Sequence, residues 1–277
     1  MLQYKYARVL TIAGSDSGGG AGIQADLKTI SALGCYGSTA ITAITAQNTI
    51  GVKSIHDVPL EIVYDQIIAV LEDIKPDAIK IGMIHTPELA LMIYTTLQKH
   101  SSLPVILDPV MVATSGDKLI KDETISTLKS KLFQLATLVT PNLDEAEILV
   151  NSKIQSTTDM IDAALVIMET GCNAVLIKGG HLKGNKLYDV FVDKNLQQQI
   201  FESIRIETNN VHGTGCSLSS AIAAFIALGN PLQQAIKKAR EYINSAIENG
   251  KDVKTGEGNG PLNHFFNPQK LIKNELV

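Results

Sequence analysis

Tryptophan is absent from this sequence, and Phe, Trp and Tyr together make up only 5% of it. Hydrophobic residues still account for 45% of the chain, so aliphatic side chains must fill most of the core. Runs of Val, Ile and Leu are typical of parallel strands that are buried on both faces of a sheet. At 277 residues the chain is long enough for one large α/β domain or two small ones.

Blocks of like charge and long apolar segments are also missing. The net charge is −4, and Lys and Arg are scattered along the chain, so neither a nucleic acid nor an anionic membrane is an expected partner. The longest uninterrupted apolar run, 221–228, is far shorter than the ~20 residues of a membrane-spanning helix. The first residues lack the apolar stretch and the cleavage site of a secretion signal.

Cysteine is sparse. Cys35, Cys172 and Cys216 are widely spaced, odd in number and not arranged in metal-ligand pairs. This pattern predicts reduced thiols and hence a cytoplasmic protein.

Strand-like and helix-like segments alternate along the chain. We expect strands at 8–13, 38–45, 78–83, 104–108, 136–140, 174–178, 187–192 and 199–206, and helices at 21–33, 61–73, 87–99, 123–132, 143–150, 157–170, 215–228 and 232–249. This alternation predicts right-handed crossovers and one mostly parallel sheet with helices on both faces. No linker or repeat interrupts it, so we expect a single domain over 1–277.

A glycine-rich segment, 14–22, follows the first strand, at the sheet edge where open α/β folds bind ligands. So many glycines suggest that the backbone approaches a ligand closely. Residues 20–25 match the loose dinucleotide pattern, but the acidic residue expected about 20 positions later is missing near 42–48. A Walker A motif is absent from the whole sequence. A tight turn without a ligand is the alternative.

A second glycine turn, His212-Gly213-Thr214-Gly215-Cys216, precedes an apolar helix. Gly213 and Gly215 allow a sharp turn that exposes N–H groups at the positive end of that helix. Such a turn favours the charge on a transferring phosphoryl group. Cys216 would lie in the first turn, where the dipole lowers a thiol pKa and could make it a base; a small buried residue is the alternative.

Polar residues follow three further strands. Asn142 and Glu145 could order Mg²⁺ and its waters against phosphate oxygens, or they could simply begin a solvated helix. Asp108 ends a strand before a loop at 113–118 and suits a metal or phosphate-side carboxylate, or a turn. Lys178 ends another strand beside glycines, where it could contact nucleotide phosphates.

Taken together, these segments resemble the hydroxymethylpyrimidine/phosphomethylpyrimidine kinases of thiamine synthesis, which are members of the ribokinase-like superfamily. The resemblance runs from about Val9 to His264. The matching segments are AGSDSGGGAGIQADLKT at 13–29, TAQNT at 45–49, DPVM at 108–111, TPNLDEAE at 140–147, IKGG at 177–180 and HGTGC at 212–216. One mild departure is the extra glycine in 17–20, where the family usually has Pro-Ser-Gly-Gly.

The resemblance implies a three-layer αβα sandwich with a mostly parallel central sheet, a homodimer, and Mg²⁺ with ATP as cofactors. It implies a small-molecule substrate that is phosphorylated twice, first on its hydroxymethyl oxygen and then to a pyrophosphate. By position, Asp26 and Gln47 match pyrimidine-binding residues, and Gly14 and Met83 the pocket wall. Glu145 matches a metal/phosphate residue, Lys178 a nucleotide-phosphate contact, and Cys216 the base.

Three alternatives remain open at this stage. A pyridoxal kinase of the same lineage is the nearest, although such dual enzymes often have Met in place of the amide at Gln47. An oxidoreductase that uses a nicotinamide cofactor is another, but it would need the acidic residue that binds the cofactor ribose, which is missing near 42–48. A catalytically silent regulator would not need Asp26, Glu145, Lys178 and Cys216 together.

Overall fold

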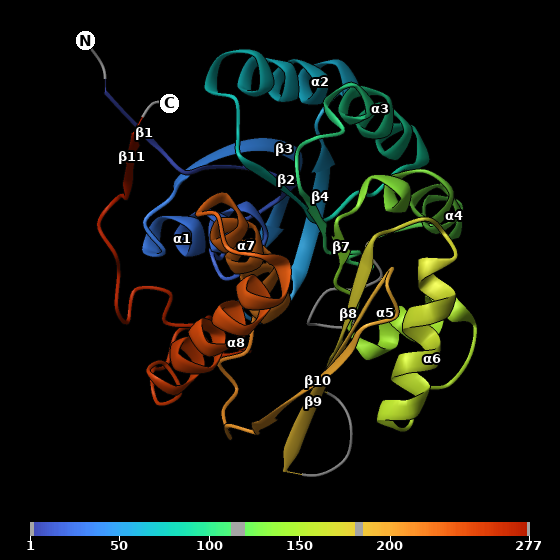
Figure 1. Cartoon of the computed structure of the whole chain (residues 1–277). Coiled ribbons are helices and arrows are strands. Elements are labelled where there is room, and N and C mark those ends of the chain that lie inside the picture. Colours follow the sequence, from blue (N-terminus) through green and yellow to red (C-terminus); the bar gives the residue numbers. More distant parts are fainter. Residues whose placement is uncertain (1–2, 112–119, 181–184, 276–277) are drawn as a thin grey trace.

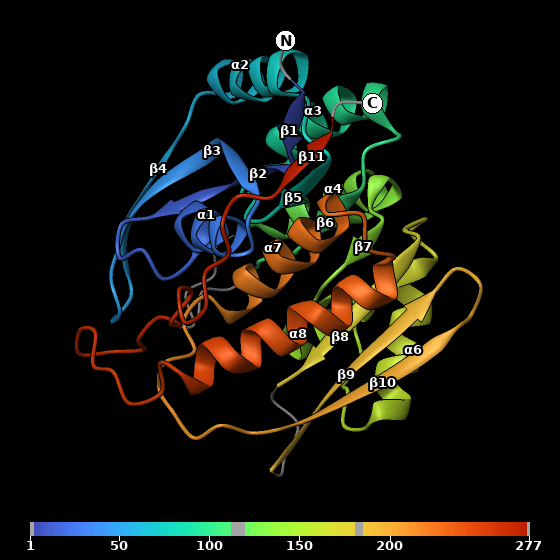
Figure 2. The same cartoon turned by 60° about the vertical axis from the view of Figure 1, so that its left-hand side comes forward.

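The computed structural model describes residues 3–111, 120–180 and 185–275. Within them, nine strands form one sheet in the order β10-β9-β8-β7-β6-β5-β2-β3-β4 (Figures 1 and 2). Their bounds are β2 Arg8–Asp16, β3 Tyr36–Gln47, β4 Val52–Asp57, β5 Ala78–Ile81, β6 Val105–Leu107, β7 Leu138–Val139, β8 Ala174–Gly179, β9 Lys186–Asp193 and β10 Gln198–Ile204. The strands from β8 through β2 to β3 run parallel, and β4, β9 and β10 pair with their neighbours in antiparallel fashion.

Helices cover both faces of this sheet. One face carries α2 Leu60–Ala69, α3 Pro87–Leu97, α4 Asp122–Ser130, α5 Leu143–Val150 and α6 Thr157–Met168. The other carries α1 Gly22–Ala32, α7 Thr214–Ala227 and α8 Leu232–Glu248, which Figure 2 shows side by side along the sheet. Leu10 and Ile12 belong to the first core and Val9 to the second, as alternation along a strand requires.

The predicted α/β fold with a mostly parallel central sheet is confirmed. The predicted helix at 21–33 is also correct, because α1 ends before Gly34, which has φ 81°. The hairpin expected at 187–192 and 199–206 is present as β9 and β10. The helix expected at 61–73 is different: α2 ends at Ala69, and a π-helical turn, 70–74, leads to Lys75 with φ 56° before Pro76.

Three strands were missed. β4 lies at the sheet edge with most of its side chains exposed, so it lacks the apolar pattern of a buried strand. β1 Tyr4–Tyr6 and β11 Lys273–Glu275 are short and pair with each other, which brings the two ends of the described chain together (Figure 1). In the described part of the chain, no helix combines the length and the apolar character needed to span a membrane.

Candidate active site

The carboxyl ends of the parallel strands converge on a cavity of about 640 Å³. The parallel strands that end at this edge are spread along the sequence, so the cavity wall combines residues from Ala13 to Ile247. Every candidate residue except Asp26 lines it: Gly14, Gln47, Met83, Asp108, Asn142, Glu145, Lys178, Gly213, Thr214, Gly215 and Cys216. The loop expected at 113–118 lies outside the described residues.

Asp26 is fully buried beneath the cavity instead of lining it. Its carboxylate accepts hydrogen bonds from Thr11 Oγ1 at 2.5 Å and Ser220 Oγ at 2.6 Å, and it pairs with Lys80 Nζ at 2.9 Å. Both oxygens are thus used inside the protein. The direct contact with the substrate that the resemblance implies has no support in this geometry.

Lys80 lines the cavity, although its side chain is fully buried. Burial alone would lower the pKa of this ammonium group, but the negative charges of Asp26 and Asp108 outweigh burial and raise the pKa. The group therefore stays charged and is one of the cations that line the cavity. Sequence reasoning missed it; the available signal was a single Lys inside the otherwise apolar strand Ala78–Ile81.

Cys216 lies half-buried in the first turn of α7. Burial raises the pKa of its thiol to about 11; the charge of Lys80 opposes this, and the carboxylates of Asp26 and Asp108 add to it. A hydrogen bond from the Gly22 N–H also opposes the rise. The expectation that the helix dipole lowers this pKa is therefore wrong here, because burial and two nearby carboxylates dominate.

Asp108, Lys178 and Glu145 form a charged cluster at the ends of β6, β8 and α5. Lys178 Nζ donates to Asp108 Oδ1 at 2.7 Å, and Thr140 Oγ1 donates to the same oxygen at 3.1 Å. Burial would lower the pKa of Lys178, but the two carboxylates raise it. The pKa of Glu145 is raised to about 7, chiefly by burial. The positive charge of Lys178 lowers this pKa, and the negative charge of Asp108 raises it further.

Asn142 and Glu145 also form a capping box at the start of α5. Asn142 Oδ1 accepts from the Glu145 N–H at 2.8 Å, and Glu145 Oε2 accepts from the Asn142 N–H at 2.8 Å. The helix-start alternative thus accounts for this pair locally. It leaves Glu145 Oε1 with one longer bond, from the Met111 N–H at 3.4 Å, at the cavity wall.

The glycine turn before α7 has the geometry of an anion hole. Gly213 has φ 82°, and a Cβ there would lie 1.8 Å from the Gly20 oxygen, so only glycine fits. The Ser217 N–H donates to the Gly213 oxygen at 2.9 Å. The N–H groups of Gly215 and Cys216 find no acceptor among the described residues, as expected in a first helical turn. They remain available to an anion.

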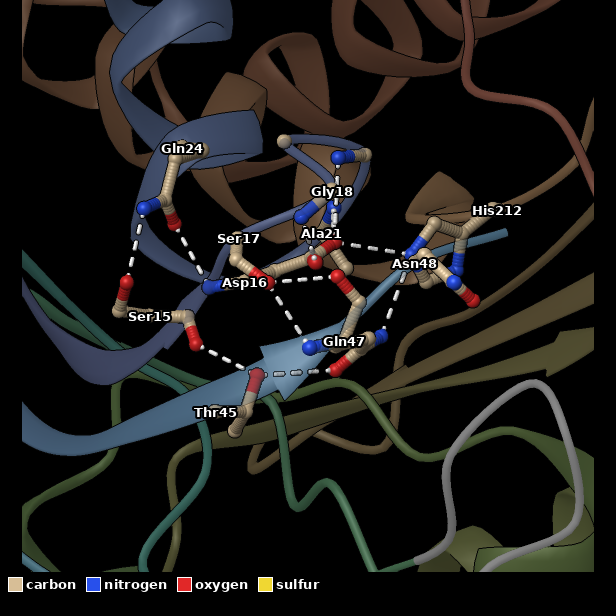
Figure 3. Close-up of polar contacts among 12 residues, drawn as sticks. Ser15, Asp16, Ser17, Gly18, Ala21, Gln24, Thr45, Gln47, Asn48 and His212 are labelled. Carbon is tan, nitrogen blue, oxygen red and sulfur yellow. Dashed lines mark hydrogen bonds and ion pairs between the residues drawn. The ribbon is translucent and has the colours of Figure 1, made fainter. Parts of the chain in front are cut away.

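The glycine-rich segment after β2 folds around the carboxylate of Asp16 (Figure 3). Asp16 accepts from the N–H groups of Gly18 at 2.8 Å, Gly20 at 3.1 Å and Ala21 at 2.8 Å, and from His212 Nε2 at 2.9 Å. Burial opposes ionisation, but these hydrogen bonds lower the pKa of Asp16. The amides of this loop are thus satisfied by its own side chain.

The expected close approach of glycine backbone to a ligand is limited to Gly14 and Gly22, which line the cavity. A Cβ at Gly14 would lie 2.6 Å from Met83 Cε, so the thioether packs directly on that backbone. The remaining glycines serve the compact turn instead. The tight-turn alternative therefore describes 18–20, and close approach to a ligand stays a prediction for Gly14 and Gly22.

Gln47 ends β3 and lies beside the glycine-rich loop (Figure 3). Its backbone is fixed by Ser17, whose Oγ donates to the Gln47 oxygen at 2.6 Å and accepts from the Gln47 N–H at 2.8 Å. Its side-chain amide lies 3.3 Å from both Thr45 Oγ1 and His212 Nε2. His212 and Asp16 belong to the two glycine-rich motifs but were not predicted as site residues. The available signal was a carboxylate inside the first glycine turn and an imidazole directly before the second.

Comparisons with known proteins agree with this arrangement. The family described as phosphomethylpyrimidine kinase matches residues 16–263. The hydroxymethylpyrimidine/phosphomethylpyrimidine kinase of Rhizobium meliloti (strain 1021) is 49% identical over 260 residues, which cover 94% of this chain and 97% of that protein.

Solved structures of two kinases are also similar to this chain. A phosphomethylpyrimidine kinase from Clostridium difficile 630 is 45% identical, with a TM-score of 0.77 and coverage of 87% of this chain and 99% of that one. A pyridoxal kinase from Bacillus subtilis, solved as an ADP complex, is 35% identical, with a TM-score of 0.86 and coverage of 94% and 98%. The resemblance inferred from the sequence is confirmed: this chain belongs to the phosphomethylpyrimidine kinase family.

Proposed function

We propose that this chain transfers the γ-phosphate of ATP to the hydroxyl group of 4-amino-5-hydroxymethyl-2-methylpyrimidine. In a second reaction it phosphorylates the monophosphate to the pyrophosphate, as a step of thiamine biosynthesis. The observation that carries this proposal is one cavity that joins the Gln47 amide to the N–H groups of Gly215 and Cys216, which have no acceptor in the described part of the chain. The R. meliloti relative, a hydroxymethylpyrimidine/phosphomethylpyrimidine kinase, supports it.

The substrate end of the cavity suits an aminopyrimidine. A carboxamide such as that of Gln47 donates and accepts at once, and so matches an amino group beside a ring nitrogen. Met83 and Gly14 supply an apolar wall on which a flat ring can pack. In this proposal they bind and orient the ring.

The phosphate end suits a nucleotide. The N–H groups of Gly215 and Cys216 and the positive end of α7 stabilise the charge of the transferring phosphoryl group, with Gly213 and Thr214 shaping the turn. A Cβ at Gly215 would lie 3.1 Å from Lys178 Nζ, so this ammonium group lies against the same backbone. This supports a contact of Lys178 with phosphate oxygens, with the ion pair to Asp108 fixing its ammonium group.

The described side chains of the site supply too few ligands for Mg²⁺ alone, so the ion would bind together with ATP. Among the described residues, no group of three or more His, Cys, Asp and Glu could hold a metal by itself. Glu145, a buried carboxylate with a raised pKa, would gain from a cation and supplies the oxygen ligand that Mg²⁺ prefers. Bound there, the ion would neutralise charge on the phosphate oxygens, which would complete its coordination together with water.

Cys216 matches the family's base position, but its thiol is protonated near neutral pH because burial raises its pKa to about 11. Phosphoryl transfer proceeds through a loose transition state in which positioning and charge stabilisation contribute most. We therefore assign most of the rate to the anion hole and the ammonium groups. Asp26 acts as a positioning residue, since it fixes Lys80.

An assay of ADP release tests the proposal directly. The purified chain would be given ATP and Mg²⁺ with hydroxymethylpyrimidine, its monophosphate or pyridoxal in parallel. We expect turnover of the first two and little with pyridoxal. Absence of ADP with both pyrimidines would overturn the proposal.

A pyridoxal kinase is the second candidate, since the B. subtilis pyridoxal kinase has a similar fold at a TM-score of 0.86. The amide at Gln47 favours the pyrimidine, because pyridoxal has no amino group beside its ring nitrogen. Turnover of pyridoxal above that of the pyrimidine in the same assay would select this candidate.

The proposal includes a single ribokinase-like domain over 1–277 that works as a cytoplasmic homodimer. Support for the cytoplasm comes from the free thiols of Cys35, Cys172 and Cys216, which suit a reducing compartment. Light scattering of the purified chain would test the dimer.

A further inference from the structure

His212 has two partners at the same ring nitrogen. Its Nε2 lies 2.9 Å from Asp16 Oδ2 and 3.3 Å from Gln47 Nε2 (Figure 3). Asp16 is ionised, since its pKa is lowered, and a carboxylate can only accept a hydrogen bond. The proton must therefore be on His212 Nε2 and be donated to Asp16. With Gln47 Nε2 on the same side, two N–H donors would face each other.

Thr45 shows the complementary conflict on the other side of the same amide. Its Oγ1 lies 2.8 Å from the Ser15 backbone oxygen and 3.3 Å from Gln47 Oε1. A hydroxyl group has one hydrogen, and the Ser15 carbonyl can only accept it. The lone pairs of Thr45 Oγ1 would then face the lone pairs of Gln47 Oε1.

One rotation of the amide removes both conflicts. An acceptor, Gln47 Oε1, then faces the His212 Nε2–H at 3.3 Å, and this single hydrogen, donated mainly to Asp16 at 2.9 Å, is shared with it. The oxygen and nitrogen of a carboxamide are nearly equal in size, so their hydrogen-bond partners decide which atom lies where. We infer that His212, held by Asp16, fixes the Gln47 amide with Oε1 toward His212 and Nε2 toward Thr45, and that this orientation sets the direction in which the substrate lies. His212 is then a positioning residue for substrate recognition.

This inference rests on the proposed function, and it explains how the ring would point. A 4-aminopyrimidine pairs its amino group with Oε1 and its neighbouring ring nitrogen with Nε2. The amino group then lies on the His212 side. The 5-hydroxymethyl group is next to the amino group on the ring and away from that nitrogen, so it also lies on that side. His212 directly precedes the turn 213–216, so the reacting hydroxyl is directed toward the anion hole. The opposite amide orientation would direct it away.

The test compares two substrates in two variants. Hydroxymethylpyrimidine is compared with the analogue that lacks the 4-amino group, 5-hydroxymethyl-2-methylpyrimidine. His212→Met removes the N–H donor, whereas His212→Gln keeps an N–H at about the same reach. We expect His212→Met to lower the kcat/KM preference for the amino substrate about tenfold, mainly through KM, and His212→Gln to restore most of it.

Ser17→Ala is the matched control, because Ser17 holds the backbone of Gln47 and not its amide. It should raise KM for both substrates and keep their ratio. An equal loss for both substrates in His212→Met would overturn the inference and place His212 in the transfer step. If the wild type phosphorylates neither pyrimidine, the proposed function fails instead.

A structure of the complex with hydroxymethylpyrimidine gives an independent readout. We expect the amino group on the His212 side of Gln47 and the hydroxymethyl group toward 213–216. A ring bound with its ring nitrogen on the His212 side would overturn the inference even if the kinase is active.

Discussion

Lys80 and Asp26 form an ion pair with both side chains fully buried, and Lys80 Nζ lies 2.9 Å from Asp26 Oδ2. Lys80 belongs to β5 and Asp26 to α1, and Ser220 of α7 donates to the same carboxylate. Three elements of the core are thus joined directly beneath the cavity. Because α7 begins with the proposed anion hole, this contact would link stability to the proposed phosphoryl transfer.

Breaking this pair by Asp26→Asn should lower the free energy of unfolding by about 3–5 kcal/mol, because it leaves the Lys80 charge buried and uncompensated. The double variant Asp26→Asn/Lys80→Met should lose less than the sum of the two single variants. Urea denaturation of all three measures this. The exposed pair Lys186–Glu202 supplies the control, and Glu202→Gln should change stability little. A loss in Asp26→Asn no larger than in that control would contradict the prediction.

Glu145 should make stability depend on pH in an unusual direction. Its pKa is raised from 4.5 to about 7 in the folded state, so the folded protein binds this proton more tightly than the unfolded chain. The free energy of unfolding from this group therefore falls as pH rises from about 4.5 through 7. Glu145→Gln keeps a capping-box residue and removes the titration. Its Tm should match the wild type near pH 4 and exceed it at pH 8.

Glu147 on the same helix is the matched control for that experiment. Hydrogen bonds from Lys153 and the Ile154 N–H lower its pKa, so its contribution is lost only as pH falls below about 4.5. Glu147→Gln should therefore show no growing advantage between pH 5 and 8. A Tm difference for Glu145→Gln that does not change with pH would mean that Glu145 is ionised throughout.

Cys216 should react slowly with iodoacetamide near neutral pH. Only the thiolate is nucleophilic, and burial raises the pKa of this thiol to about 11. The labelling rate, followed by mass spectrometry, should rise steadily between pH 7 and 10. Cys35 and Cys172 are buried and should stay unlabelled in the folded protein, which makes them internal controls. A rate that levels off below pH 8 would show an activated thiolate.

The sequence predicted the elements that a buried sheet and amphipathic helices require. Strand Arg8–Asp16 and helix Gly22–Ala32 follow from apolar pattern and a terminal glycine, both of which are local. β4 could not be predicted in the same way, because an edge strand is held by pairing with β3 and buries little of its own surface. The π-helical turn 70–74 also has no local signature beyond the following Pro76.

The site residues also differ in whether local sequence or tertiary packing determines their environment. The sequence indicated Gly213 and Lys178 because a glycine turn and the end of an apolar strand can both be recognised from neighbouring residues. It could not indicate that both carboxylate oxygens of Asp26 would bind Lys80, since the two residues are brought together only by the tertiary packing of α1 and β5. The predicted lowering of the Cys216 pKa was wrong for the same reason. The helix dipole can be inferred from local sequence, whereas burial and the charges of Asp26 and Asp108 depend on the tertiary structure.

Gln47→Met should change the substrate preference of the enzyme more than its capacity to transfer phosphate. The amide is the donor and acceptor that matches an aminopyrimidine, and a thioether offers neither a donor nor a strong acceptor. We expect kcat/KM for hydroxymethylpyrimidine to fall by at least tenfold and that for pyridoxal to stay level or rise.

Gln24→Met is the control, since its amide binds Ser15 Oγ and the Asp16 N–H and does not line the cavity. It should keep the preference of the wild type. Parallel ADP-release assays with both substrates decide the matter, and an unchanged preference in Gln47→Met would remove Gln47 from substrate selection. Because the proposed anion hole lies on α7 and not on β3, kcat with any substrate that still binds should fall much less than its kcat/KM.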